Sequence, residues 1–211
     1  MRVPALSLSK GAVSDRGLAT SSRASLAAIC LALAVLSAVV YWPVGRYGFV
    51  NFDDAQYVSQ NPVVLRGLTL EGVQWSFTSG TAGNWFPLTW MSHMLDATIF
   101  GANAGAQHLV NVALHAANAA LLFLALWCMT RARWRSAFVA ALFAVHPIHV
   151  ESVAWIAERK DVLSAFFWMW SLLAYVAYVE RRSAARYALL LLTFALGLMA
   201  KPMVVTLPLV E

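Results

Sequence analysis

The sequence predicts an all-α fold: a polytopic membrane helical bundle of about five to six spans, with a long first outer loop that carries interfacial helices. Hydrophobic residues make up 61% of the chain and charged residues only 12%, against roughly 45–50% and about 25% in soluble domains. The apolar residues also form blocks close to the ~17–25 residues that cross a bilayer. Basic residues gather in alternate junctions between these blocks. A polytopic membrane protein accounts for all three observations.

The elements follow in order along the chain. Residues 1–24 lack hydrophobic periodicity, and we expect them to form a disordered cytoplasmic tail. The next block carries no charge and ends without a small-residue cleavage site, so we expect a retained signal anchor. A proline at 147 is expected to end the third helix at His146. The expected spans are 25–42, 109–129, 136–150, 162–179 and 187–200, with the start of another from 203 and an outer loop at 43–107.

Charge placement predicts the orientation of the bundle. Arginines fill two short junctions, 131–135 and 181–186, and the N-terminal tail is also basic. Under the positive-inside rule these three segments face the cytoplasm, and the acidic segments between them face outward. The formal net charge of +5 is then mostly inner-face anchoring, and we expect no nucleic-acid partner.

The outer loop contains one stretch with helical periodicity. Leu88, Met91 and Leu95 recur at i, i+3 and i+7. Trp90 and Met94 broaden this stripe, which leaves His93 and Asp96 toward the other side. Such spacing predicts a short helix that lies in the membrane interface. A helix packed against its own loop is the alternative.

Two adjacent acids, Asp53 and Asp54, follow the first span. Adjacent carboxylates repel each other, so burial could raise the pKa of one of them and make it a proton acceptor. The two could also share a divalent cation. A turn before Asn61-Pro62 explains the same residues without any chemistry. The spacing leaves these alternatives open.

The second span carries a polar stripe. Its members fall within an arc of about 80° on a helix, and because a polar stripe is costly in lipid, we expect it to face the bundle interior or a cavity. Hydrogen bonds that only join helices are the alternative. The stripe consists of His108, Asn111, His115 and Asn118.

The second outer junction concentrates imidazoles and charges, and a lysine follows the fifth apolar block. The histidines lack the H-E-x-x-H order, which argues against zinc. Cationic side chains here would suit a phosphate headgroup, whereas a capped, solvated helix start or a snorkelling lysine requires no ligand. The candidates are His146, His149, Glu151, Arg159, Lys160 and Lys201.

Five motifs occur in a fixed order, and together they resemble the GT-C membrane glycosyltransferases. The resemblance is closest to the transmembrane O-mannosyltransferases with C-terminal TPR repeats and to their bacterial relatives, over their N-terminal portion. One departure is Phe86 before the second motif, where relatives often carry a polar or basic residue. The motifs are Phe52-Asp53-Asp54, Pro87-Leu88-Thr89, the segment from His108 to His115, the segment from His146-Pro147 to Ala154, and Arg159-Lys160-Asp161.

The resemblance implies an inverting enzyme that moves a sugar, with mannose as one candidate, from a polyprenyl-phosphate donor to a protein or glycan acceptor at the extracytoplasmic face. It implies that Asp53 is the catalytic base, that Asp54 orients the acceptor or a cation, and that the six candidates above bind the donor phosphate and sugar. No cofactor is certain, and the metal is left unassigned. The expected partners are membrane lipids, the lipid-linked donor and the acceptor.

The resemblance to the bacterial relatives leads us to expect the bacterial inner membrane, and the charge pattern predicts a cytoplasmic N-terminus. Since such enzymes have roughly twice as many spans, we expect a fragment that could be inactive alone. Two other function classes stay open: a non-catalytic protein that binds a lipid phosphate, and a transporter that uses the polar stripe. The sequence shows no inverted repeat, which disfavours the transporter.

Overall fold

The computed structural model describes residues 11–209, and within them all regular structure is helical, as predicted. The long helices are α1 (Gly11–Tyr41), α5 (Ala104–Thr130), α6 (Arg133–Val145), α8 (Arg159–Glu180) and α9 (Ala184–Ala200). The shorter α-helices are α2 (Pro62–Leu65), α3 (Leu70–Thr78), α4 (Pro87–Phe100) and α7 (Val150–Ala154). Short segments of 3-10 or π geometry are η1 (Trp42–Arg46), η2 (Ala55–Ser59), η3 (Thr81–Gly83), η4 (Pro147–His149), η5 (Ile156–Glu158) and η6 (Pro202–Leu209).

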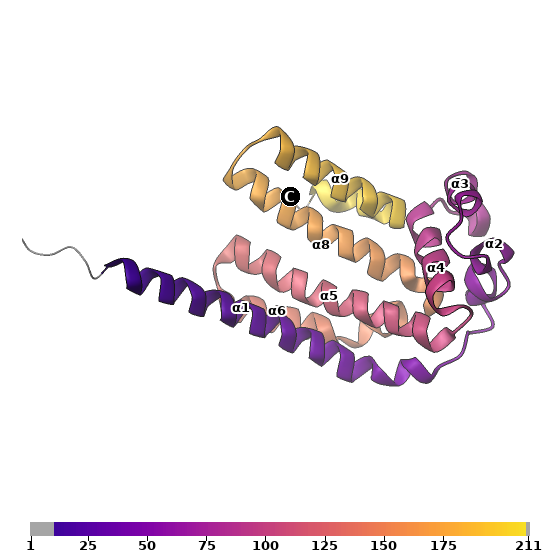
Figure 1. Cartoon of the computed structure of the whole chain (residues 1–211), viewed down its shortest axis with the longest axis horizontal. Helices are drawn as coiled ribbons and strands as arrows, with labels where there is room; N and C mark the ends of the chain where they lie inside the picture. Colours follow the sequence, from indigo (N-terminus) through magenta and orange to yellow (C-terminus); the bar gives the residue numbers. More distant parts are fainter. Residues whose placement is uncertain (1–10, 210–211) are drawn as a thin grey trace, which may run out of the picture.

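The long helices lie side by side, and α2, α3 and α4 cover one end of the bundle, which we call the capped end (Figure 1). Helix α5 is central, because it packs against α1, α6 and α8, while α9 packs on α8. Leu33, Ala119, Phe123 and Ala140 form a buried cluster that joins α1, α5 and α6. Small alanines at this interface let the helix backbones approach closely, as is usual in membrane bundles.

Three helical segments are long and apolar enough to cross a membrane: Arg23–Arg46, Ala104–Thr130 and Ile156–Glu180. Helix α6 and the segment Pro147–Ala154 would make a fourth if they count as one broken span, with a bend of 49°. Helix α9 is apolar but shorter. The structure therefore shows three to four candidate spans of the five to six expected. The predicted end of the third helix at His146 is confirmed, because α6 stops at Val145 before Pro147.

The two ends of the chain differ in part from expectation. Residues 1–10 lie outside the described residues, and from Gly11 onward the expected disordered tail continues α1 toward the N-terminus. Extending an existing helix costs far less than starting one, and residues 11–24 contain no proline to stop it. Residues from 203, expected to begin another span, lie in the 3-10 segment η6 as far as 209.

The arginine-rich turns lie together at the end of the bundle opposite the cap. One joins α5 to α6 and the other joins α8 to α9, and the start of α1 lies at the same end (Figure 1). An ion pair of 2.9 Å between Arg131 and Glu180 links the two turns. The basic and acidic segments thus occupy opposite ends of the bundle, which is the arrangement that the charge pattern predicts.

Helix α4 is present as predicted, and it packs against its own loop, which is the second of the two alternatives. Trp90 and Met94 of the predicted apolar stripe are fully buried in a cluster with Tyr57 and Val64. Leu95 of the same stripe is 45% exposed.

The opposite side of α4 is buried as well. His93 is fully buried and Asp96 nearly so. Arg159 of α8 pairs with Asp96, and this ion pair is a contact that periodicity could not reveal.

Candidate functional site at the capped end of the bundle

Asp54 is a fully buried structural residue. Its Oδ2 accepts a hydrogen bond from the Val50 backbone N–H at 2.8 Å, and its Oδ1 accepts one from the Ala157 N–H at 2.9 Å. The second bond spans 103 residues and fastens the first loop to the turn before α8. Buried backbone donors of this kind need a partner. By binding both N–H groups, Asp54 holds the acidic loop, the segment around Phe52-Asp53-Asp54, in place.

Asp53 is the accessible acid of the pair. Its side chain is half-buried and makes no hydrogen bond or ion pair with any residue between 11 and 209. The charge of Asp53 acts on Tyr57, whose pKa is raised to about 12, first by burial and then by the negative charges of Asp53 and Glu158. The two adjacent acids therefore differ in their surroundings: Asp54 is buried and hydrogen-bonded, whereas Asp53 is half-buried and has no partner among residues 11–209.

Lys160 lies close to Tyr57, the residue on which the charge of Asp53 acts. Its ammonium donates to Glu158 at 2.7 Å and to the Ala157 carbonyl at 3.2 Å, and it sits 4.9 Å from the centre of the Tyr57 ring. Attraction to the ring face helps to fix the ammonium there. Lys160 also lines a cavity of about 220 Å³ together with Lys201. We call this cavity the lysine pocket.

Lys201 follows the last residue of α9 and forms an ion pair with Asp161. The other carboxylate oxygen of Asp161 accepts a hydrogen bond from Ser152 at 3.1 Å. Lys201 and Asp161 also line a second cavity of about 250 Å³, whose other walls include Trp168 and Met203. We call it the apolar pocket. Lys201 lines both cavities, so the lysine pocket and the apolar pocket are adjacent.

Arg159 is held inside the protein and lines none of the pockets described here. It is fully buried. Its Nη1 donates to Ser92 at 2.9 Å, its Nη2 donates to Asp96 at 2.7 Å and to the Gln107 carbonyl at 2.9 Å, and its Nε donates to Asn111. The guanidinium thus joins α4, α5 and α8.

Comparison with known proteins gives the family. The chain is 34% identical over 191 residues to the protein O-mannosyl-transferase Tmtc1 of Drosophila melanogaster, a match over 86% of this chain and 21% of that protein. It is 32% identical over 171 residues to human TMTC1, over 75% of this chain and 18% of that protein. It is 36% identical over 104 residues to human TMTC2, over 49% and 12%.

The chain is a distant homologue of the TMTC protein O-mannosyltransferases. It spans about a fifth or less of the length of these curated relatives. No family model matches the chain, and no solved structure matches it significantly. The resemblance drawn from the five motifs is confirmed.

In this TMTC homologue, the remaining candidates of the second junction lie apart from the lysine pocket. His146 is exposed, and its Nδ1 accepts a hydrogen bond from the Ile148 N–H at 3.2 Å. His149 is half-buried, with its ring 5.6 Å from that of His115. Glu151 is exposed and has no side-chain partner among residues 11–209.

The polar stripe of α5 lies inside the bundle, and each of its four members reaches a different backbone carbonyl. Two of them, His115 and Asn118, also line a cavity of about 220 Å³ that we call the histidine pocket. His115 and Asn118 join α5 to α6 and α8, while His108 and Asn111 bond carbonyls in the connecting segments, so the structure favours the role of the stripe in holding the bundle together. The distances are 3.2 Å for His108 to Gly48, 2.9 Å for Asn111 to Trp155, 3.1 Å for His115 to Ala144 and 2.8 Å for Asn118 to Val162.

Three residues that shape the site were not among the candidates named from the sequence. Asp161 lines both the apolar and the histidine pockets. Thr89 is fully buried and donates to the carbonyl of Ala200 at 2.9 Å, which fixes α4 against the residue before Lys201. The signal for both was present, because Asp161 ends one of the five motifs and Thr89 ends another.

His93 is the third of these residues and has an unusual environment. It is fully buried, and neither ring nitrogen has a hydrogen-bond partner among the described residues. Burial, followed by the positive charges of Arg159 and Lys160, lowers its pKa well below the ordinary 6.5. The imidazole is therefore neutral beside two cations. Within residues 11–209, no three His, Cys, Asp or Glu side chains are grouped to hold a metal ion.

Proposed function

We propose that this chain forms part of a GT-C type membrane glycosyltransferase that acts at its capped end. The observation that carries the proposal is that the carboxylate of Asp53 has no partner among residues 11–209. The adjacent Asp54 anchors the backbone of this segment through its bond to Ala157. The lysine pocket lies on the same side of the cap and offers two cations. The names of the relatives as protein O-mannosyl-transferases support a sugar as the transferred group and a protein as the acceptor.

Asp53 acts in this proposal as the general base. Its carboxylate takes the proton of an acceptor hydroxyl while the hydroxyl oxygen attacks the anomeric carbon of the donor sugar. The bond from that carbon to the phosphate oxygen breaks, and the lipid phosphate leaves with the bonding electron pair. One displacement inverts the anomeric centre, so a single base suffices and no covalent sugar–enzyme intermediate forms.

The donor is proposed to be a polyprenyl-phosphate sugar bound across the lysine and apolar pockets. Lys160 and Lys201 would neutralise the phosphate, and walls such as Trp168 and Met203 would contact the isoprenoid chain. Binding requires Lys201 to share its ammonium with the phosphate or to leave Asp161 for it. Arg159 would contribute by fixing α8, which carries Lys160, to α4 and α5.

The finer topology is also part of the proposal. Helix α9 would be a further span, α6 and α7 together would form a broken one, and an additional span would start near 203. The arginine-rich end would face the cytoplasm, with the cap on the extracytoplasmic side of a bacterial inner membrane. His146, His149 and Glu151 stay as proposed contacts of the sugar, by their position at the capped end. We assign no metal.

The test uses the protein in membranes, supplied with labelled polyprenyl-phosphate sugars. Wild type is expected to transfer label, and Lys201→Gln is expected to weaken donor binding, because it removes a cation from both pockets. Arg66→Gln is the matched control, since Arg66 is exposed and pairs only with Glu71. Donor binding without any transfer would favour the lipid-phosphate binder instead. Donor binding unchanged in Lys201→Gln would refute the assignment of the pocket.

A further inference from the structure

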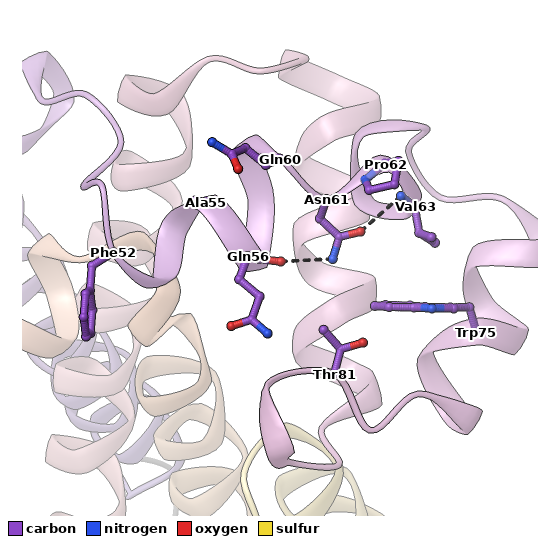
Figure 2. Close-up of a pocket in the computed structure, with 9 residues that line it drawn as sticks. All are labelled: Phe52, Ala55, Gln56, Gln60, Asn61, Pro62, Val63, Trp75 and Thr81. Atoms are coloured by element: carbon purple, nitrogen blue, oxygen red, sulfur yellow. Dashed lines mark hydrogen bonds between the residues drawn. The ribbon is translucent and has the colours of Figure 1, made fainter.

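The largest of the pockets described lies beside the acidic loop and has no role in the chemistry above. It has a volume of about 490 Å³ and lies between η2 and α3. Figure 2 shows the side chains of Gln56 and Gln60 on one side and those of Trp75 and Thr81 on another, with Phe52 at one end. We call it the glutamine pocket.

Two of the polar side chains that line this pocket are free to bind a ligand. Asn61 is already engaged, because its Nδ2 donates to the Gln56 carbonyl at 3.1 Å and its Oδ1 accepts from Val63 N–H at 3.1 Å (Figure 2). The side-chain amides of Gln56 and Gln60, in contrast, are exposed and make no hydrogen bond with residues 11–209. None of the residues lining the pocket is charged.

The backbone that carries the two glutamines is itself unusual. Segment η2 is a π-helix, a rare form that is frequent at functional sites. Tyr57 lies on the buried face of this π-helix, and Lys160 lies over its ring. Gln56 and Gln60 line the pocket. Asp53 stands just before this π-helix. Asp53 also follows Phe52, which lines the glutamine pocket, and its charge acts on Tyr57, over which Lys160 lies.

We propose that the glutamine pocket binds the acceptor as an uncharged stretch of polypeptide, an assignment that rests on the proposed function. Side-chain amides both donate and accept, and so they match the N–H and C=O groups of a peptide main chain. Phe52, 70% exposed, offers an apolar contact for a neighbouring side chain. Trp75 is already packed edge-on against Trp90, with 5.2 Å between ring centres, which limits its use as a platform for a sugar ring.

The lack of charge in the pocket determines which peptides fit. A charged side chain would lose hydration there without gaining a counter-charge, which is unfavourable. An acidic side chain next to the acceptor hydroxyl would also approach the carboxylate of Asp53. The pocket therefore selects Ser- or Thr-containing segments whose neighbours carry no charge.

The test measures the binding of fluorescent peptides to the full chain without any sugar donor. Three peptides differ only at the residues flanking a threonine, which are neutral, acidic or basic. Wild type is expected to bind the neutral peptide most tightly. Gln60→Lys is expected to shift the preference toward the acidic peptide by roughly fivefold, the effect of one new charge pair at the surface. Gln74→Lys is the matched control, since Gln74 is exposed on α3 outside the pocket.

The outcomes separate this inference from the proposed function. Selective peptide binding that Gln60→Lys redirects and Gln74→Lys does not would support the pocket even if no sugar were transferred. The inference is overturned if wild type binds no peptide, or if the two lysine variants behave alike while transfer continues. Displacement of the peptide by a neutral oligosaccharide at lower concentration would overturn it in favour of a glycan acceptor.

Discussion

Replacing Arg159 tests whether it braces the cap or binds the donor. Arg159→Met removes the guanidinium and leaves Asp96, which is 3% exposed, buried without its ion partner. Breaking a buried ion pair from one side costs about 3–5 kcal/mol. At roughly 2–4 °C per kcal/mol for a protein of this size, the midpoint of thermal unfolding in detergent should fall by about 6–20 °C.

The double variant Arg159→Met/Asp96→Leu is the decisive comparison. It removes the orphaned charge, and buried ion pairs replaced by apolar residues are often tolerated, so it should recover part of the lost stability. Recovery stays incomplete, because Ser92 and the Gln107 carbonyl still lose their donor. Arg66→Met, at an exposed ion pair, serves as control. An Arg159→Met variant that melts like wild type but no longer binds the donor would refute the brace and restore a direct role.

Three further predictions follow from the same contacts. Asp161→Asn removes the carboxylate that competes for Lys201 while keeping an oxygen for Ser152, so the affinity for polyprenyl phosphate should rise roughly twofold to fivefold; weaker binding by the folded variant would contradict this. Thr89→Val should lower the free energy of unfolding by about 1–3 kcal/mol, because it leaves the buried carbonyl of Ala200 unpaired, and Thr89→Ser should restore it. His93 takes up a proton near pH 6.5 in the unfolded chain but not in the folded one, so its contribution is complete above that pH and stability should fall below it, by up to about 1.4 kcal/mol per pH unit. His93→Gln should flatten that slope in melting curves, and an unchanged slope would show that another group titrates.

Much of the fold was predictable because it depends on local patterns. Hydropathy located α5 and α8, and the proline at 147 located the end of α6. The spacing of the polar stripe placed it inside the bundle, since 3.6 residues per turn fixes which side chains share a face. These are properties of neighbouring residues, and the sequence contains them directly.

The division of roles at the site depends on contacts between residues far apart in the chain. Asp53 and Asp54 look equivalent in the sequence, and only the bond from Ala157, 103 residues away, makes one of them a brace. Arg159 and Lys160 are also adjacent, yet one residue turns a helix by about 100°. One side chain therefore points into the protein core and the other toward the lysine pocket.

Helix α4 shows the same division between local and distant contacts. Its periodicity placed Trp90 and Met94 on one face, and both are fully buried against the loop. The burial of Asp96 on the other side depends on Arg159, which lies 63 residues away in the chain. A buried guanidinium needs a partner, and the sequence does not show which acid reaches it.

The most direct test of the account compares catalysis and donor binding in one variant, Asp53→Asn. The amide keeps the shape of the side chain but cannot take a proton, and removal of a general base lowers turnover by roughly 10²–10⁴-fold. We expect this loss of turnover in membranes with the Asp53→Asn variant that bind the polyprenyl-phosphate sugar as tightly as membranes with the wild-type protein. Turnover that persists in Asp53→Asn would contradict the account, because the chemistry would then reside elsewhere in the protein.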